Sequence, residues 1–273
     1  MRYDRDIPFP VKQYANNAVG RDFVVADLHG CLDLFEKKLD RAGFDPERDV
    51  VYSVGDLCDR GARSFDTLCL IEKPWFRFVP GNHEAMLLTY LNVRGSDYHR
   101  ASDFLYNGGY WIDELTEPQR RHLRDVLVPI LFEAPLVMQV ADEDCPFNVL
   151  HAEAMDKREK MLCDADFRDM TLIEKQATPL AWSRRLVGKS QRLLNEHTVV
   201  AANGTMIAEP ALHPGLSLTY VGHTILEQPI LHKSHLFIDG GAYMAEAGNE
   251  AAGLSLLNHR DTVRMLRAAG VAL

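Results

Sequence analysis

Residues 50–61 have the sequence VVYSVGDLCDRG, in which an apolar run passes directly into a segment rich in charged side chains. The run over 50–54 is mostly β-branched or aromatic and predicts a buried strand. The segment 55–61 then places two aspartates and an arginine between glycines, as suits a loop at a strand end. In open α/β sheets, functional side chains gather at the carboxyl ends of strands. This stretch therefore predicts both a fold class and the position of a site.

Two more apolar runs lead into polar motifs in the same way. Residues 23–26 precede DLHG at 27–30, and residues 76–79 precede GNHE at 81–84. Behind each of the three motifs, apolar side chains recur at helical spacing. Strand, motif and helix thus alternate three times, which is typical of βαβ units. The predicted helices cover residues 31–42, 63–72 and 84–92.

The second half of the chain is richer in strand patterns. A helix is expected over 118–127, where a proline suits the first turn. Residues 172–182 are expected to be helical in part, with an interruption at Pro179. The pattern alone supports an α/β or α+β fold. Further strands are predicted at residues 136–141, 147–150, 218–221, 229–232, 236–238 and 253–257.

The composition is that of an ordinary globular protein. The 273 residues are 47% apolar and 25% charged, which suits a chain that buries a substantial core. No repeat or Pro/Gly/Ser linker divides the sequence, so we expect a single domain over residues 1–273. Within it, residues 1–20 are expected to form an N-terminal extension and residues 195–215 an exposed, mobile loop.

Charge and cysteine content restrict the partners and the compartment. The net charge of −9 argues against nucleic acid as a binding partner. Five cysteines, an odd number without CxxC spacing, predict neither a disulfide scaffold nor a structural zinc site. The first residues lack the apolar segment of a signal peptide, and no apolar stretch is long enough to span a bilayer. We therefore expect a cytoplasmic protein without a membrane partner; the oligomeric state stays open.

The motifs also supply metal-binding side chains. An aspartate and a histidine two residues apart lie on one side of an extended chain, and an aspartate can bridge two ions through its two oxygens. The donors are oxygen and nitrogen atoms without a thiolate, which favours Mn, Fe or Zn. The candidate ligands are Asp27, His29, Asp56, Asn82, His151 and His223.

The order and spacing of these motifs over residues 23–257 resemble the phosphoprotein phosphatase family of metallophosphatases, in particular its phage lambda and bacterial serine/threonine branch. The resemblance implies a four-layer α/β (α+β) fold in which two mixed β-sheets pack as a sandwich and are flanked by helices. It also implies two divalent metal ions, with Mn²⁺ expected and Fe or Zn as alternatives. The first ion is assigned to Asp27, His29 and Asp56, and the second to Asp56, Asn82, His151 and His223.

The resemblance also implies catalytic roles. A hydroxide bridging the two ions would attack phosphorus directly. His83 would protonate the leaving group, with Asp59 holding its ring. Arg60 and Arg184 would bind the substrate phosphate, because a planar guanidinium matches two phosphate oxygens. Arg185 is adjacent and is an alternative to Arg184.

The implied function is a metal-dependent serine/threonine protein phosphatase acting on phosphorylated proteins or peptides, with phosphotyrosine as a further expected substrate. The alternative is a symmetrical dinucleoside polyphosphate (diadenosine tetraphosphate) hydrolase on the same scaffold. Those relatives lack the aspartate of the Asp-Arg-Gly step, so Asp59 favours the phosphatase. A catalytically inactive binding module would be expected to have lost a ligand, and none is missing.

Some positions depart from the family pattern or lie outside it. Ala26 stands where the family usually has glycine, and Glu153 stands where relatives often have aspartate. Residues 239–241 are expected to form a turn that shapes the site. Cys58 lies between two site aspartates, so its oxidation would lower activity, although a small buried residue is the simpler interpretation. Seven other histidines are expected at the surface or in packing: His99, His122, His197, His213, His232, His235 and His259.

Overall fold

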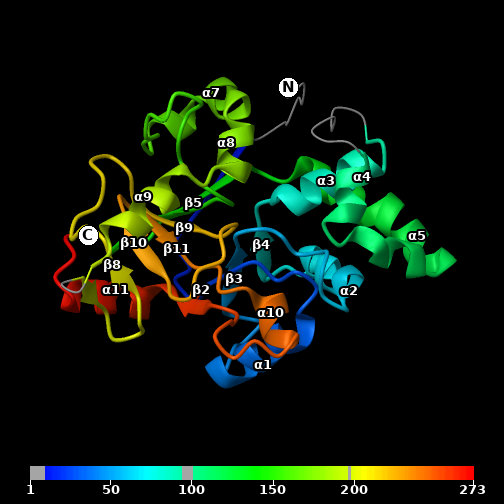
Figure 1. Ribbon diagram of the computed structural model, residues 1–273, viewed down its shortest axis with the longest axis horizontal. Helices are drawn as coiled ribbons and strands as arrows, with labels where there is room; N and C mark the ends of the chain where they lie inside the picture. The colour runs from blue at the N-terminus through cyan, green and yellow to red at the C-terminus, as the bar shows by residue number, and fades with distance from the viewer. Residues whose placement is uncertain (1–9, 94–100, 196–197) are drawn as a thin grey trace.

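The computed structural model describes residues 10–93, 101–195 and 198–273. Two mixed β-sheets face each other, and Tyr52 of one sheet meets Phe147 of the other with ring centroids 5.5 Å apart. Helices α1 and α10 lie beside the smaller sheet, and α7 to α9 lie over the larger one (Figure 1). The predicted two mixed sheets with flanking helices are therefore confirmed.

The smaller sheet contains the three predicted strand, motif and helix units. Its order is β12-β2-β3-β4, in which β2, β3 and β4 are parallel and β12 is antiparallel to β2. Helix α1 buries Leu32, Phe35 and Leu39 on one face, as its periodicity predicts. The bounds are β2 Asp22–Val25, α1 Leu32–Ala42, β3 Val50–Ser53, α2 Ser64–Leu68 with the 3₁₀ turn η1 Cys69–Glu72, β4 Phe76–Phe78, α3 Asn82–Tyr90 and β12 Leu256–Asn258.

The larger sheet has the order β1-β5-β6-β9-β11-β10-β8-β7 and mixes parallel with antiparallel pairs. One face packs against the smaller sheet in a continuous apolar core. The other face is covered by a second apolar cluster beneath α7 to α9. Its strands are β1 Val11–Tyr14, β5 Val137–Val140, β6 Phe147–Val149, β7 Val199–Val200, β8 Met206–Ile207, β9 Leu218–Val221, β10 Ile230–His232 and β11 His235–Phe237.

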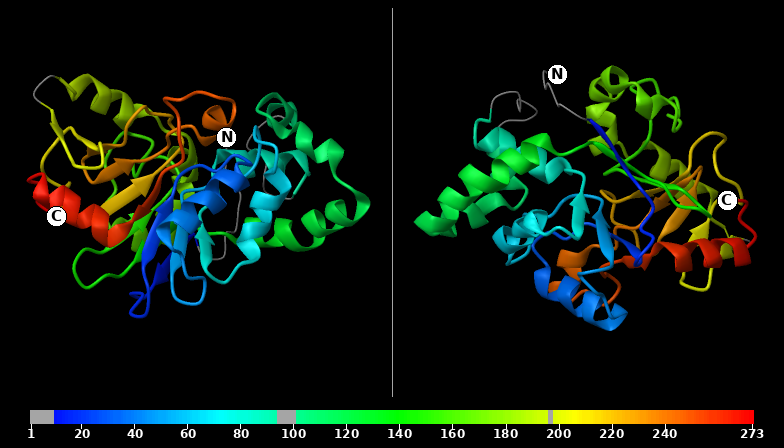
Figure 2. Two further views of the ribbon diagram at one scale, coloured as in Figure 1. Left: turned by 90° about the horizontal axis from the view of Figure 1, so that it is seen from below. Right: turned by 180° about the vertical axis from the view of Figure 1, so that it is seen from behind.

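The remaining helices lie between and after these strands. Figure 2 shows, in its left view, α11 and the segment from α3 to α6 at opposite ends of the molecule. Among the described residues, none of the helices combines the length and apolarity needed to cross a membrane. The elements are α4 Ala101–Tyr106, η2 Gly109–Glu114, α5 Glu117–His122, the π-helical turn η3 Leu123–Leu127, α6 Val128–Glu133, η4 Asp166–Arg168, α7 Met170–Lys175, α8 Ala177–Trp182, α9 Arg185–Leu193, α10 Ala242–Glu246 and α11 His259–Ala268.

The structure differs from the sequence-based expectations in several segments. The helical stretch expected around Pro179 is divided at Gln176, and Pro179 lies in the first turn of α8, where its missing N–H has no helical partner to lose. The expected N-terminal extension contains β1, which pairs in parallel with β5. The segment expected as a loop at 195–215 contains the short strands β7 and β8.

Candidate dinuclear metal centre

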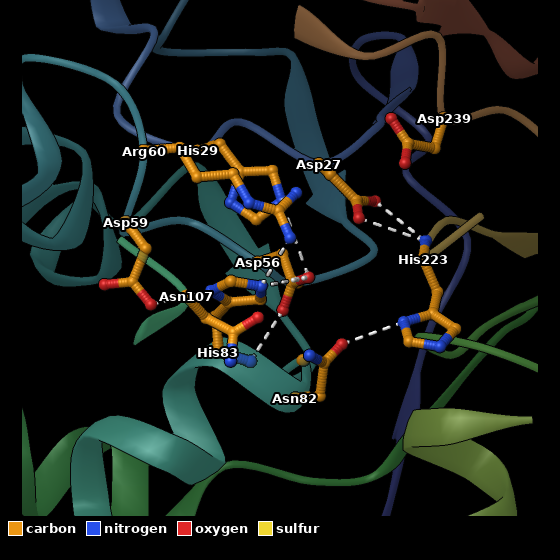
Figure 3. A network of polar contacts seen from close by, with 12 residues as sticks. Asp27, His29, Asp56, Asp59, Arg60, Asn82, His83, Asn107, His223 and Asp239 are labelled. Atoms are coloured by element: carbon orange, nitrogen blue, oxygen red, sulfur yellow. Dashed lines mark hydrogen bonds and ion pairs between the residues drawn. The ribbon is translucent and has the colours of Figure 1, made fainter. Parts of the chain in front are cut away.

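Five strands, β2, β3, β4, β6 and β9, end close together, and each leads into a loop with candidate ligands (Figure 3). The structure brings all six candidate ligands into one buried cluster. Such burial of carboxylates and imidazoles calls for compensating charge. Their exposed fractions are Asp27 1%, His29 2%, Asp56 2%, Asn82 5%, His151 1% and His223 6%.

Asp56 occupies the middle of this cluster. Its Oδ2 lies 3.7 Å from Nε2 of His29 and 3.4 Å from Nε2 of His151. Two groups of ligand atoms close enough to hold an ion share it, one including His29 and the other including His151 and His223. This position suits a carboxylate that bridges two ions.

The hydrogen bonds of two histidines define which nitrogen is available. Nδ1 of His29 lies 2.9 Å from the carbonyl oxygen of Cys58, and Nδ1 of His151 lies 2.8 Å from that of Val54. A carbonyl only accepts, so each Nδ1 carries the hydrogen. Each Nε2 is thereby directed at the cluster, where it can bind a metal ion once it carries no hydrogen.

The chemistry of the donor set fits cations. Oδ1 of Asn82 lies 2.9 Å from Nε2 of His151 and 2.8 Å from Nδ1 of His223. Nε2 of His223 is buried and has no hydrogen-bond partner among the described residues. An amide oxygen only accepts, so each of these contacts takes a hydrogen on the imidazole nitrogen, and a metal ion can replace those hydrogens. The oxygen and nitrogen donors that face one another here fit a divalent ion.

The ionisation of the same groups points in this direction. Burial, followed by the negative charge of Asp239, raises the pKa of Asp27 well above its usual range. Burial lowers the pKa of His29 to about 3. For His151, burial acts downward, but the charge of Asp56 raises the pKa to about 9. At neutral pH His29 is therefore neutral and His151 charged, and a divalent ion bound beside the crowded carboxylates would displace the proton of His151.

A histidine–aspartate pair borders the cluster. Nδ1 of His83 lies 2.6 Å from Oδ2 of Asp59, and the indole Nε1 of Trp111 donates to Oδ1 of Asp59 at 2.7 Å. Asp59 is fully buried. Because both carboxylate oxygens accept, Asp59 holds the ring of His83 in one orientation, with Nε2 directed toward the site.

The candidate arginines face the cluster in different ways. Arg60 places Nη1 2.9 Å from Nε2 of His29 and Nη2 3.0 Å from Nε2 of His83, and it lies 4.8 Å above the ring of Tyr243. Nη2 of Arg184 donates to the carbonyl of His223 at 3.2 Å. Arg185 instead donates to the exposed carboxylate of Glu159. Of the two neighbouring arginines, the first faces the site.

Two fully buried glutamates hold the loops of the site. Glu84 accepts hydrogen bonds from the backbone N–H groups of residues 56, 57, 58 and 81 at 2.7–3.3 Å. Glu153 accepts from the N–H groups of Arg185 at 3.1 Å and Val187 at 2.9 Å, and from the hydroxyl of Ser183. Glu84 therefore fixes the loop of Asp56, and Glu153 fixes the beginning of α9.

The backbone of the site is strained. Nine non-glycine residues among those described have positive φ, and five of them belong to the site: His29, Asp56, Asp59, Arg60 and His223. Neighbouring glycines allow the carboxylates to approach closely, since a Cβ at Gly81 would overlap Oδ1 of Asp56 and one at Gly222 would overlap Oδ1 of Asp27. Strain of this kind is concentrated at functional sites.

Sequence reasoning missed several residues that support the site. Trp111 and Tyr243 were not predicted to belong to the site. Asp239 is buried beside Asp27 and accepts from the N–H of Gly241 at 2.9 Å, which fits the expected turn (Figure 3). Cys58 is buried, and burial raises the pKa of its thiol, so it is a poor target for oxidation.

Four of the seven histidines outside the motifs have ordinary surroundings, whereas Nδ1 of His213 is buried without a hydrogen-bond partner among the described residues. His232, His235 and His259 are buried and hydrogen-bonded, which confirms a packing role. His122 is half-exposed and contacts Glu72. His99 and His197 lie outside the described residues.

Comparison with known proteins adds independent information. Residues 23–169 match the family model described as Metallophos, Calcineurin-like phosphoesterase. Serine/threonine-protein phosphatase 2 of Salmonella typhimurium is 29% identical over 223 residues, covering 81% of this chain and 87% of the relative. The symmetrical bis(5'-nucleosyl)-tetraphosphatase of Dechloromonas aromatica is 41% identical over 68 residues, 24% of this chain and 25% of the relative.

The fold also has counterparts among solved structures. A protein serine/threonine phosphatase from Saccharomyces cerevisiae, described as similar to human phosphatase PP5, superposes with a TM-score of 0.51 at 13% identity. The match covers 85% of this chain and 71% of that one. At this identity the likeness concerns the fold.

Proposed function

The chain belongs to the calcineurin-like phosphoesterase family, and from this premise we propose that it is a metal-dependent serine/threonine protein phosphatase. The observation that carries the proposal is the contact of 2.6 Å between Nδ1 of His83 and Oδ2 of Asp59. An alkoxide leaving group needs a proton, and this pair can deliver one. The relative named as a protein phosphatase also matches 81% of the chain, against 24% for the tetraphosphatase.

The family implies a pair of divalent ions, and the donor set of the cluster fits them. We propose Mn²⁺ as the preferred ion, with Fe or Zn as alternatives, because oxygen and nitrogen donors without a thiolate suit all three. Ions bound there would supply positive charge for the phosphoryl oxygens and lower the pKa of a water molecule. The residues proposed to bind them are Asp27, His29 and Asp56 for one ion, and Asp56, Asn82, His151 and His223 for the other.

The protein's own residues position the substrate and move the proton. Arg60 and Arg184 bind non-bridging phosphate oxygens from two sides, since their guanidinium groups face the cluster. Without substrate, Arg60 donates to Nε2 of both His29 and His83; when phosphate binds, Arg60 donates to the phosphate instead, which leaves Nε2 of His83 free to carry a proton. His83 donates the proton on Nε2 to the leaving oxygen, and Asp59 stabilises the charged ring before the transfer.

The surface next to Arg184 supports a peptide substrate. A pocket of about 520 Å³ opens there, lined by Lys157, Trp182 and Arg185 among others. Its open, mixed basic and aromatic surface suits the chain on either side of a phosphorylated residue. We propose that phosphotyrosine is accepted as well as phosphoserine and phosphothreonine. The odd cysteine number without CxxC spacing supports the cytoplasm as the location.

The test compares three substrates after metal removal with EDTA and reconstitution with Mn²⁺. A phosphothreonine peptide, diadenosine tetraphosphate and p-nitrophenyl phosphate are assayed side by side on wild type, Asp59→Asn and a control, Asp261→Asn, at an exposed surface position. We expect metal-dependent peptide hydrolysis whose kcat falls about 10²–10⁴-fold in Asp59→Asn. The control should retain wild-type rates.

The alternative function makes the opposite prediction. A dinucleoside polyphosphate hydrolase releases a nucleotide phosphate, which is a better leaving group and needs less protonation. Preference for diadenosine tetraphosphate, with little change in Asp59→Asn, would replace the protein phosphatase by that activity.

A further inference from the structure

A second group of metal-binding side chains lies outside the site. Ligand atoms of Cys69, Glu72 and His122 all lie within 4.8 Å of one another. Cys69 and Glu72 are three residues apart on the 3₁₀ turn η1, so they lie on the same face of it. His122 ends α5, and the following turn η3 packs against η1. The fold thus brings together three ligands from two distant segments.

The geometry of this group is suited to an ion. Nε2 of His122 lies 2.8 Å from Oε2 of Glu72. The ring of His122 packs edge-on against Phe65, with centroids 6.2 Å apart, which limits its orientation. The side chains of His122 and Glu72 are 36% and 34% exposed, so an ion can enter from solvent. The turn after His122 is π-helical, an irregularity that is frequent at functional sites.

Glu72 supplies the carboxylate of this group. Glu72 and Asp66 both act on the Cys69 thiol and Lys73 opposes them, but Asp66 is paired with Arg63 at 2.9 Å, so Glu72 is the carboxylate that an ion can share with Cys69. Burial, together with these two carboxylates, raises the pKa of the Cys69 thiol to about 11. The thiol is therefore protonated at neutral pH until a cation displaces its proton.

We propose that Cys69, Glu72 and His122 bind one Zn²⁺ ion, separate from the dinuclear centre. Thiolate, imidazole and carboxylate are all established zinc ligands, and a water molecule completes the tetrahedron. Binding releases the thiol proton to solvent, and the hydrogen on Nε2 of His122 moves by solvent exchange to Nδ1, so that two coordination bonds replace the Glu72–His122 hydrogen bond. The absence of CxxC spacing does not count against the site, since its ligands come from segments fifty residues apart.

The ion has a structural consequence for the active site. It fastens η1, which follows the loop of Asp59 and Arg60, to the helical segment that begins with α4 and η2 and carries Trp111. Trp111 donates to Asp59. Zinc therefore stabilises the segment that holds the proposed proton donor in place.

Co²⁺ provides a readout that is independent of activity. A cobalt–thiolate bond gives a strong charge-transfer absorption in the near ultraviolet, which the oxygen and nitrogen donors of the dinuclear centre do not produce. Metal-free protein titrated with Co²⁺ should develop this band with one equivalent bound at Cys69. The band should disappear in Cys69→Ser and weaken in His122→Ala, whereas Cys163→Ser, at the other half-exposed cysteine, should retain it.

Metal content gives a second measurement. After dialysis against Zn²⁺, wild type should retain one more equivalent than Cys69→Ser, and its thermal midpoint should rise more on adding Zn²⁺. A missing thiolate band, or a band that persists in Cys69→Ser, would overturn the proposal. If Cys69→Ser does not fold, zinc content is compared in the same way for His122→Ala, which should retain one equivalent less than wild type.

Discussion

Glu84 and Glu153 are both fully buried and both accept several hydrogen bonds, yet they support opposite sides of the site. Glu84, on α3, fixes the loop of Asp56 on the side of the metal ligands. Glu153 fixes the N-terminal turn of α9, next to Arg184 on the side of the substrate. A carboxylate near a helix N-terminus also gains from the helix dipole. The same device thus positions metal binding in one region and phosphate binding in the other.

Among the variants that test this comparison, Glu84→Gln is expected to have the largest effect, which is on Mn²⁺ affinity. The amide retains one acceptor oxygen and presents a donor to backbone N–H groups, so the loop of Asp56 loses part of its support. We expect Mn²⁺ affinity to fall about 10–100-fold, as for other residues that orient metal ligands. Metal content after dialysis and Mn²⁺ titration of activity measure this.

The matched control is Glu36→Gln, at an exposed position on α1. Its Mn²⁺ affinity should equal that of wild type. Wild-type affinity in Glu84→Gln as well would mean that the loop is held by other contacts.

Glu153→Gln should affect the substrate instead. Loss of the charged acceptor weakens the start of α9 by about 1.5 kcal/mol, so the position of Arg184 becomes less defined. We expect the KM for a phosphothreonine peptide to rise about tenfold, with the bound Mn²⁺ unchanged. If this variant lost metal as Glu84→Gln does, the two glutamates would not support separate regions.

Asp22 is another buried carboxylate, but it does not accept a comparable set of hydrogen bonds, which allows a comparison with Glu84 and Glu153. Its Oδ1 has no hydrogen-bond partner among the described residues, and burial raises its pKa from 3.8 to about 6, with Asn17 and Arg77 offsetting only part. Below about pH 4 it is protonated in both states and costs nothing. Between about pH 4 and pH 6 the carboxyl ionises in the unfolded chain but stays protonated in the folded one, so its cost to stability grows over this range and is constant at higher pH.

Asp22→Asn should therefore stabilise the protein at neutral pH by about 1–2 kcal/mol. Thermal unfolding at pH 7.5 and pH 5 measures this, and the gain should shrink at the lower pH. An equal gain at both pH values would show that ionisation is not its cause.

Among these variants, Glu153→Asp is expected to have the smallest effect, which is on the KM for the peptide. The shorter aspartate side chain keeps the negative charge at the beginning of α9. The KM should change less than about threefold, because the charged hydrogen bonds are retained in part. A loss as large as that of Glu153→Gln would mean that reach, more than charge, positions Arg184.

The sequence correctly predicted those strands and helices that are defined by local patterns. The strands before residues 27, 55 and 81 and the helices behind them were identified because apolar periodicity and glycine-bounded motifs coincide there. Helices α9 and α11 were not anticipated. The strand β1 was also missed, since its outward side chains are polar and only pairing with β5 makes it a strand.

The candidate site divides in the same way. The ligand residues lie in short motifs that can be recognised in the sequence. The residues that support them do not lie in such motifs, because Trp111 reaches Asp59 from 52 residues away and Glu153 reaches α9 from more than 30 residues away. Contacts of this range depend on tertiary packing and leave no periodic signal.

The positive φ angles at His29, Asp56, Asp59, Arg60 and His223 have a consequence for stability. Each such residue costs about 1–2 kcal/mol relative to glycine, which adopts this conformation freely. Mutations to glycine at these positions would relieve strain while removing side chains of the site. Stability and the site therefore make opposing demands on these five positions.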